Sequence, residues 1–513
     1  MTGDATPLQG AGTVKNAAIN NEHCVIGIDI GTGSLKAVAV YSNGFQGRTA
    51  QRVYETRSSA PGFNEQDPEE IWTAFIECLT ELLEDGDVQP GALAFSSAMH
   101  SLVAVDATGT PITPLIIWSD ARSARIAEAL KASPEGEAFY TATGTPIHAM
   151  TPLCKIRWLQ EAEPRLFPQV HKFISIKEYI WWKLFGVYEI DHSIASATGM
   201  FGIETLSWHG EALGWAGISP AQLSTPVATG FCRPFAGNSG ITTRLPAGIP
   251  LFIGASDGCL ANLGTGAMSK GIASITIGSS GAIRVARPKP ILTFPSMPFA
   301  YRLKTDLFIC GGPVNNGGIV IRWLLQTFYG ISSPTSSDFT HFFDDIEPVE
   351  PGAEGLLFLP HLTGERAPVW DARSCGTFFG LKQHHTTIHM MRAAVEGVCF
   401  ALNQTLLMLE DATSSINEII VSGGFIHSNT WLQILADITG KPLHVVEAHD
   451  ASATGAAFLA MEALGLGYVP PPRLRSIEPD PLRHQQYQKY YAVYTRLYPS
   501  LKEAMHALHQ INH

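Results

Sequence analysis

Two aspartates stand directly after apolar stretches of the sequence, where a carboxylate could meet a phosphate or a sugar hydroxyl. Asp29 precedes the turn 31–34, which reads Gly-Thr-Gly-Ser, and Asp257 lies within 254–258, which reads Gly-Ala-Ser-Asp-Gly. Glycines allow positive φ and close approach, and turn amides and hydroxyls can bind anionic oxygens. A divalent cation would reconcile Asp29 with an anion beside it, and Asp257 could be the general base of a phosphoryl transfer. The alternatives are an ordinary tight turn at 31–34 and a helix N-cap at Asp257.

A second glycine-rich turn repeats the design of the first. Segment 271–285 reads as an apolar strand, the turn Gly-Ser-Ser-Gly at 278–281, and a further strand. Two such turns predict two related domains that face one nucleotide, although two common hairpins could also coincide. A third apolar run ends in Ser422-Gly423-Gly424, and Ser428 can cap the helix that follows, a corner suited to the adenosine or phosphate end of a nucleotide.

Polar and aromatic residues after two other predicted strands could contact a substrate, because α/β proteins bind ligands at the carboxyl ends of strands. Met99 and His100 follow the strand predicted at 91–96. Trp118, Asp120 and Arg122 supply an aromatic wall, an acceptor and a donor. The alternatives are a structural histidine and a helix capped by Asp120. The loop 363–368 could line a cleft, but a structural role is favoured for it.

Composition limits the class of protein. A chain of 513 residues exceeds what one core accommodates, so two or three domains are expected. With 45% hydrophobic and 16% charged residues, no leader-like amino terminus and no long apolar run, the sequence predicts a soluble cytoplasmic protein. A net charge of -12 argues against a nucleic-acid partner, and eight cysteines without a C-x-x-C pair argue against zinc or a disulfide framework.

The order of predicted elements indicates an α/β fold in two domains. Strands are predicted at 24–30, 36–41, 91–96, 101–105 and 251–254, and helices at 68–84, 121–131 and 259–267. We expect a mobile tail at 1–22, a first domain at 23–268 and a second at 269–513. The second half predicts a strand ending at Gly312, a strand at 355–359, and helices at 316–328, 386–409 and from 428. The stretch 484–511 looks helical with a break at Pro499, and either packs on the second domain or forms a dimer surface.

Taken in order, these motifs resemble the FGGY family of carbohydrate kinases, over about residues 24–466. In that family two domains with actin-like (ribonuclease H-like) cores enclose ATP and a sugar or polyol. The resemblance implies that Asp257 is the catalytic base, that Asp29 and Asp257 bind Mg²⁺ with ATP, and that Met99, His100, Trp118, Asp120 and Arg122 contact the substrate. It places these residues at the nucleotide: Thr32, Gly33, Ser34, Lys36, Gly278, Ser279, Gly312, Asn316, Gly423, Gly424 and Ser428. Gly33 and Ser279 stand where Thr is common, so the first position loses a hydroxyl and the second keeps one.

Two segments narrow the resemblance within the family. Residues 315–324 and 364–371 look most like gluconate kinases, which implies in-line transfer from ATP to a terminal hydroxyl of D-gluconate. Arg122, Lys177 and Arg366 are the candidates for binding a substrate carboxylate. Xylulose or another pentulose or polyol is the alternative substrate, and an actin-like ATPase without a sugar is a more distant alternative. No nucleic-acid or membrane partner is expected, and a homodimer stays open.

Overall fold

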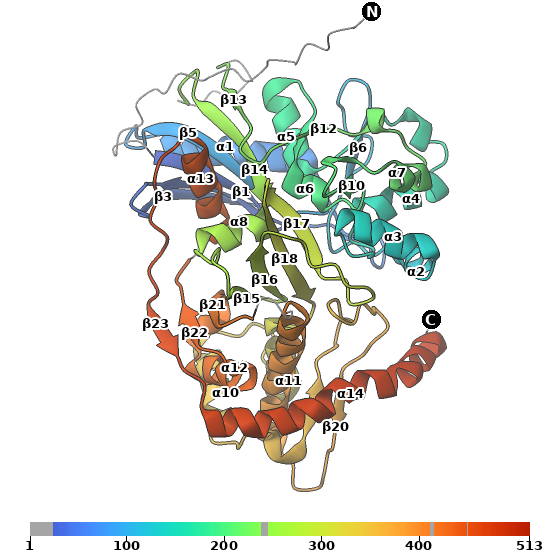
Figure 1. The fold of residues 1–513 in the computed structure, drawn as a ribbon, viewed down its shortest axis with the longest axis vertical. Coiled ribbons are helices and arrows are strands. Elements are labelled where there is room, and N and C mark those ends of the chain that lie inside the picture. The colour runs from blue at the N-terminus through green and yellow to red at the C-terminus, as the bar shows by residue number, and fades with distance from the viewer. Residues whose placement is uncertain (1–23, 238–244, 411–414, 449, 513) are drawn as a thin grey trace, which may run out of the picture.

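The computed structural model describes residues 24–237, 245–410, 415–448 and 450–512 (Figure 1). The tail predicted at 1–22 lies outside these residues. The first sheet has the strand order β13-β14-β5-β1-β2-β3. Its strands are β1 (Cys24–Ile30), β2 (Ser34–Val40), β3 (Gln46–Val53), β5 (Pro90–Ser97), β13 (Cys232–Pro234) and β14 (Pro250–Ser256).

The second sheet repeats the arrangement of the first. Its order is β17-β18-β16-β15-β21-β22-β23. Its strands are β15 (Ile272–Ile277), β16 (Gly281–Arg287), β17 (Phe299–Lys304), β18 (Leu307–Val314), β21 (Glu418–Ser422), β22 (Leu443–Val445) and β23 (Arg475–Ile477). In each sheet the strand before the glycine turn pairs antiparallel with the strand after it and parallel with another strand, β5 or β21. The predicted α/β architecture with two related halves is confirmed.

Helices cover the sheets and connect their strands. The helices of the first half are α1 (Pro68–Leu83), α2 (Ala124–Lys131), α3 (Pro134–Thr143), α4 (Pro152–Ala162), α5 (Ile176–Phe185), α6 (His192–Ser196), α7 (Gly210–Ala216) and α8 (Asp257–Gly264). Those of the second half are α9 (Gly318–Tyr329), α10 (Ser336–Ile346), α11 (Thr387–Met408), α12 (Asn429–Thr439), α13 (Ala451–Ala463) and α14 (Pro481–Asn512). Helix α1 shows why such segments become helical: Asp67 caps it, Pro68 begins it, and Ile71, Phe75 and Leu79 recur on its buried face.

Short strand pairs complete the fold outside the two sheets. They are β4 (Glu65–Gln66) with β7 (Leu115–Ile116), β6 (Val103–Val105) with β8 (Lys172–Ile174), β9 (Glu189–Asp191) with β12 (Thr225–Val227), β10 (Phe201–Gly202) with β11 (Ser207–Trp208), and β19 (Leu357–Leu359) with β20 (Thr377–Phe379). The pairs β4–β7 and β6–β8 flank the segment that carries Trp118 and Asp120. In the described part of the chain, none of the helices is long and apolar enough to cross a membrane.

Helix α13 joins the two halves. Although it follows the strands of the second sheet in sequence, it lies in Figure 1 beside the first sheet, against β1 and β5, and also packs on α8. The packing is close: a Cβ placed on Gly27 would lie 2.0 Å from the Ala453 carbonyl oxygen, and one on Gly455 would lie 1.9 Å from that of Leu260. The division predicted at residue 268 does not indicate this return of the chain to the first sheet.

The C-terminal helix corrects one expectation. Helix α14 runs through Pro499 without the predicted break, although proline removes a backbone hydrogen bond there. Tyr498 and His506, on either side of the proline, both hydrogen-bond the Asp371 carboxylate, at 2.8 and 2.5 Å. This shared acceptor holds both parts of the helix on one surface. Tyr487, Tyr494 and Leu497 are buried in the core of the second half, as the packing alternative predicts.

Candidate active site

Three parallel strands of the first sheet bring the two aspartates to the same edge. Asp29 of β1 is in register with Ser96 of β5, and Ser97 of β5 is in register with Ser256, which precedes Asp257. Ser96 Oγ donates a hydrogen bond to Asp29 Oδ1 at 2.8 Å. Burial raises the pKa of Asp29 to about 7, and the negative charge of Asp257 adds to this rise. The two predicted carboxylates are therefore electrostatic neighbours in a buried setting.

The electrostatics of this edge fit a divalent cation. Mg²⁺ is commonly held by one or two carboxylates together with water and substrate phosphates. A cation between Asp29 and Asp257 would remove the repulsion and the desolvation that now favour protonation of Asp29. The described residues contain no cluster of three or more His, Cys, Asp or Glu arranged to bind a metal on their own. Asp29 and Asp257 are only two ligands, so a cation bound here would need further ligands from water and from the phosphates of the nucleotide.

Asp257 is the first residue of α8, and Ser256 occupies its N-cap position. The N-cap alternative is therefore wrong for Asp257, whose Oδ1 accepts a hydrogen bond from the Gly258 amide at 2.7 Å. Burial raises the pKa of the Asp257 carboxyl, while the charge of Arg284 opposes this shift. A raised pKa makes a carboxylate a better proton acceptor, which suits a general base.

Met99 and His100 lie beside this edge. A Cβ on Gly258 would lie 3.2 Å from Met99 Cε, so the methionine packs next to Asp257. His100 is buried and has a left-handed φ of 67°, which is costly for a residue with a Cβ. Its Nδ1 lies 2.8 Å from the Ala197 carbonyl oxygen and so carries the hydrogen, which leaves Nε2 to accept from Tyr301 Oη at 3.3 Å. Burial lowers the pKa of His100 to about 3, so the ring is neutral.

Trp118 contacts the first glycine turn. Its Nε1 donates to Thr32 Oγ1 at 2.9 Å, while Gln66 donates to the Thr32 carbonyl oxygen at 2.5 Å. Ser34 Oγ accepts from Gln51 at 2.9 Å. The residues of this turn are half-buried or exposed, and Gly33 has open space where a Cβ would stand. Gly31 and Gly33 do not have the expected positive φ. Their missing side chains therefore leave space beside the turn, and the turn does not depend on a left-handed glycine.

Lys36 lies on β2, two residues beyond the first turn, and it is already paired. Its Nζ forms an ion pair with Asp450 Oδ1 at 2.8 Å, just before α13. The predicted nucleotide contact of Lys36 stays a prediction, and it would have to compete with this bond.

The second turn and the Gly-Gly corner meet at the edge of the second sheet. Thr276 of β15 is in register with Ser422 of β21, and the two hydroxyls lie 3.1 Å apart. Gly423 has a φ of 101° and lies so close to β15 that a Cβ would be 2.6 Å from the Ile277 carbonyl oxygen. Gly278, Ser279, Gly423 and Gly424 are all exposed there. Ser428 caps α12 by accepting from the Trp431 amide, as predicted.

Two predicted nucleotide contacts are not supported by their positions. Gly312 is buried against α11, where a Cβ would lie 2.4 Å from Thr405 Cγ2 and 2.8 Å from Ala367 Cβ. Asn316 is fully buried, and its amide donates to the Gly364 carbonyl oxygen and to Glu365 while accepting from Thr363. Both residues are enclosed by protein, and the Asn316 side chain holds the loop at Thr363, Gly364 and Glu365; their nucleotide contacts stay predictions.

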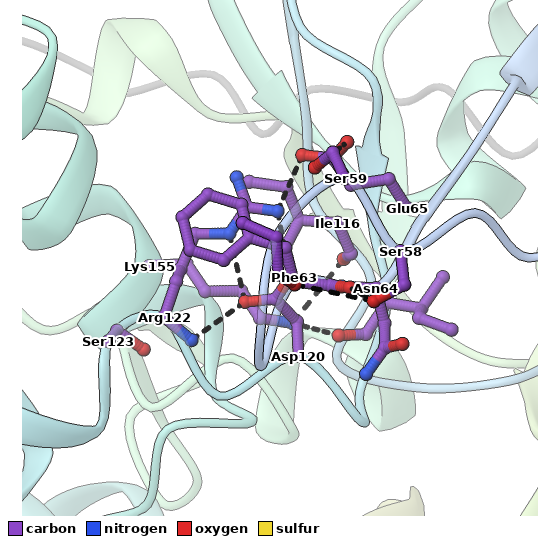
Figure 2. Close-up of polar contacts among 12 residues, drawn as sticks. Ser58, Ser59, Phe63, Asn64, Glu65, Ile116, Asp120, Arg122, Ser123 and Lys155 are labelled. Atoms are coloured by element: carbon purple, nitrogen blue, oxygen red, sulfur yellow. Dashed lines mark hydrogen bonds and ion pairs between the residues drawn. The ribbon is translucent and has the colours of Figure 1, made fainter. Parts of the chain in front are cut away.

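Asp120 and Arg122 form a closed network, shown in Figure 2. Asp120 accepts from the Asn64 amide at 2.7 Å and from Arg122 at 2.8 and 2.9 Å. Arg122 also bonds Glu65 at 2.6 Å, and its guanidinium stacks 3.9 Å from the centre of the Phe63 ring. Substrate contact by this pair stays a prediction, and the geometry favours a positioning role. Lys177, another candidate for a substrate carboxylate, is buried and paired with Asp191 at 2.5 Å.

Sequence reasoning missed Arg284 and Tyr301, two residues of the second sheet that approach the aspartate edge. A Cβ on Gly258 would lie 3.1 Å from Arg284 Nε, and Tyr301 bonds His100. Arg366 joins them from the loop after β19, with its guanidinium 5.2 Å from the centre of the Trp118 ring. The available signal was an arginine three residues beyond the second turn, on the strand face opposite its neighbours.

Comparison with known proteins agrees with this arrangement. Residues 24–264 match the N-terminal domain and residues 273–464 the C-terminal domain of the FGGY family of carbohydrate kinases. A gluconokinase of Bacillus licheniformis is 41% identical over 86% of this chain and 88% of its own length.

Two solved structures are similar in fold over most of their length. A xylulose kinase from Lactobacillus acidophilus has a TM-score of 0.89 and 31% identity, over 95% of this chain and 100% of that one. A gluconate kinase from the same organism has a TM-score of 0.87 and 31% identity, over 93% of this chain and 98% of that one. The chain therefore belongs to the FGGY family of carbohydrate kinases and is a phosphotransferase that acts on a sugar.

Proposed function

We propose that this enzyme phosphorylates D-gluconate to 6-phospho-D-gluconate with ATP, and that Asp257 takes the proton from the attacking hydroxyl. The observation that carries the gluconate assignment is the 41% identity to a gluconokinase over most of both chains. The positive charges of Arg284, which acts on Asp257, and of Arg366, which acts on Arg284, support it, because gluconate carries a carboxylate and neutral sugars do not.

Both halves of the molecule supply parts of the proposed transfer. The edges at Thr32–Ser34 and at Gly278–Ser279 offer exposed or half-buried turns for phosphates, and Gly423–Gly424 offers a neighbouring corner for the nucleotide. We assign Met99, which packs beside Gly258, together with neutral His100 and with Trp118, which bonds the first turn, to the sugar side. Mg²⁺ held by Asp29 and Asp257 would neutralise charge on the phosphates. Asp257 needs only to hold the hydroxyl proton while the phosphoryl group moves in line.

Replacement of Asp257 by Asn tests the base assignment. This substitution keeps the Gly258 contact possible but removes the proton acceptor, so kcat should fall about 10²-fold or more. The coupled assay should measure ADP formation with gluconate, and thermal unfolding should show that the variant folds. Asp106→Asn, in an exposed turn after β6, is the matched control and should keep full activity. A variant that retains more than about a tenth of the turnover would rule out Asp257 as base.

Xylulose is the second candidate substrate. The solved xylulose kinase matches this fold with a TM-score of 0.89. Its sequence identity to this chain, 31%, is the same as that of the gluconate kinase. Parallel assays with gluconate, D-xylulose, D-ribulose and glycerol decide between them. A kcat/KM for D-xylulose above that for gluconate would overturn the gluconate assignment and leave the kinase activity intact.

A further inference from the structure

Among the described residues, Arg284 has no hydrogen-bond or ion-pair partner that would explain a charged group at this place. It lies on β16, and no hydrogen bond or ion pair joins its guanidinium to another described residue. Burial lowers its pKa, and the only opposing effects come from Asp257 and Cys259. By surface exposure Arg284 is half-buried, and a charged group that loses part of its water shell is normally paired or hydrogen-bonded, because desolvation is costly. Within the described ranges, the Arg284 guanidinium therefore lacks a close partner.

Arg366 adds a second positive charge to the same place. Its Nε donates to Asn315 Oδ1 at 2.6 Å and its Nη2 to the Val314 carbonyl oxygen at 3.2 Å, which leaves Nη1 without a bond to a described residue. Burial lowers the pKa of Arg366 to about 10, and repulsion by Arg284 contributes. Glu365 offsets this charge only in part, because its carboxylate is bonded to the amides of Asn315 and Arg366 and to the Asn316 side chain.

The remaining groups nearby carry no negative charge to spare. His100 is neutral, and the pKa of Tyr301 is raised well above its usual value by burial, so its phenol stays protonated. The charge of Asp257 opposes the lowering of the Arg284 pKa, but no hydrogen bond or ion pair joins the two side chains. In the proposed reaction Asp257 is engaged by the hydroxyl that it deprotonates and by the cation. Two neighbouring guanidinium groups thus remain, Arg284 under the charge of Asp257 and Arg366 under that of Glu365, and their charges repel each other.

We propose that Arg284, assisted by Arg366, binds the carboxylate of a sugar-acid substrate and so selects sugar acids over neutral sugars. This inference rests on the proposed function. A guanidinium matches a carboxylate with two parallel hydrogen bonds, which neither the Lys177 ammonium nor the closed Arg122 network offers here. The location also fits: Arg284 adjoins Gly258 and Met99 on the sugar side, whereas the exposed turn residues Gly278 and Ser279 lie further along the hairpin.

The test compares two substrates that differ only at the acid group. D-gluconate and D-glucitol share their hydroxyl pattern, but D-glucitol has a hydroxymethyl group in place of the carboxylate. Arg284→Met should lower kcat/KM for gluconate by about 10²-fold or more, because it leaves the carboxylate without its charged partner. It should change kcat/KM for D-glucitol by less than about 10-fold. Arg284→Lys, which keeps the charge but not the paired geometry, should fall between.

Controls separate this inference from the proposed function. Arg287→Gln changes an arginine on the same strand whose guanidinium donates to the Leu409 carbonyl oxygen, and it should leave the substrate ratio unchanged. Calorimetric binding of MgADP reports that each variant has a folded nucleotide site. An equal loss for both substrates, or no loss for either, would overturn the carboxylate role and point instead to the phosphoryl group or to structure. A wild-type enzyme that uses D-xylulose but not gluconate would overturn the proposed function before any variant is made.

Discussion

Arg122 and Arg284 both lie near the proposed sugar side, but their surroundings differ: the Arg122 side chain is buried and Arg284 is half-buried. Arg122 is surrounded by the carboxylates of Asp120 and Glu65 and by the ring of Phe63 (Figure 2), and the ring of Trp158 lies 5.1 Å from its guanidinium. Arg284 meets Asp257 alone, and only through a longer-range interaction. The charge of Arg122 is paired with carboxylates and stabilises the loops that carry them. The guanidinium of Arg284, which is not paired in this way, can bind a ligand. The comparison therefore distinguishes a charge that stabilises the fold, on Arg122, from one that is available to a substrate, on Arg284.

Breaking the closed network should have the largest effect on stability. Arg122→Met would leave Asp120 and Glu65 as buried carboxylates without their partner, since the Arg122 side chain is 5% exposed and that of Asp120 is fully buried. We expect the free energy of unfolding to fall by about 3–5 kcal/mol. Urea denaturation followed by circular dichroism measures this loss.

Two controls sharpen that result. Arg125→Met alters a side chain that is 82% exposed and should change stability by less than about 0.5 kcal/mol. Arg284→Met, without substrate, should cost no stability, because it removes a charge that the protein does not pair. If Arg284→Met destabilised the free enzyme as much as Arg122→Met, the distinction between the two arginines would be wrong.

Lys155 links the closed network to the sugar side. Its buried Nζ donates to the carbonyl oxygens of His100, Ile117 and Ile116, at 2.6, 2.8 and 3.3 Å. Lys155→Met would leave these acceptors unbonded, so the free energy of unfolding should fall by about 1–3 kcal/mol. Because the His100 backbone is strained, its ring should also lose its position, and KM for the sugar should rise more than kcat falls. A loss of stability with an unchanged KM would contradict the positioning role.

Two buried histidines near Arg366, His100 and His148, should make the stability of the fold decrease in acid. His148 has a pKa lowered to about 3 by burial and by the charge of Arg366, and His100 has a similarly low pKa. An unfolded histidine titrates near pH 6.5, so below that pH the unfolded chain binds protons that the folded chain does not. The free energy of unfolding should therefore fall as pH decreases from about 6.5 toward about 3, by up to about 1.4 kcal/mol per pH unit for each histidine.

His148→Asn separates this effect from general acid sensitivity. The amide oxygen can replace Nδ1 as acceptor for the Met150 amide, which lies 3.1 Å away. The slope of stability against pH should become shallower in the variant. Identical slopes in both proteins would contradict the assignment to His148.

The sequence predicts those parts of the site that depend on local pattern. Apolar runs ending in Asp29, in Ser96 and in Ser256 predict strands whose carboxyl ends meet, and the register confirms that these ends lie together. Gly312 and Asn316 were placed by motif, but their roles depend on α11 and the loop 363–366, which pack against them from elsewhere in the chain. The sequence signal for Arg284, its place three residues beyond the second turn, is weak, because an arginine on a strand is expected to face solvent until the packing around it is known.

The return of α13 to the first sheet governs the order in which the protein can be completed. Residues 24–256 supply every strand of that sheet, but the face over Gly27 is covered only when residues 451–463 have been synthesised. During translation we therefore expect this apolar face of the first sheet to stay exposed until nearly the whole second half has been synthesised. A fragment that stops at residue 268 lacks this cover and should aggregate, whereas supplying α13 through a fused linker should restore its solubility.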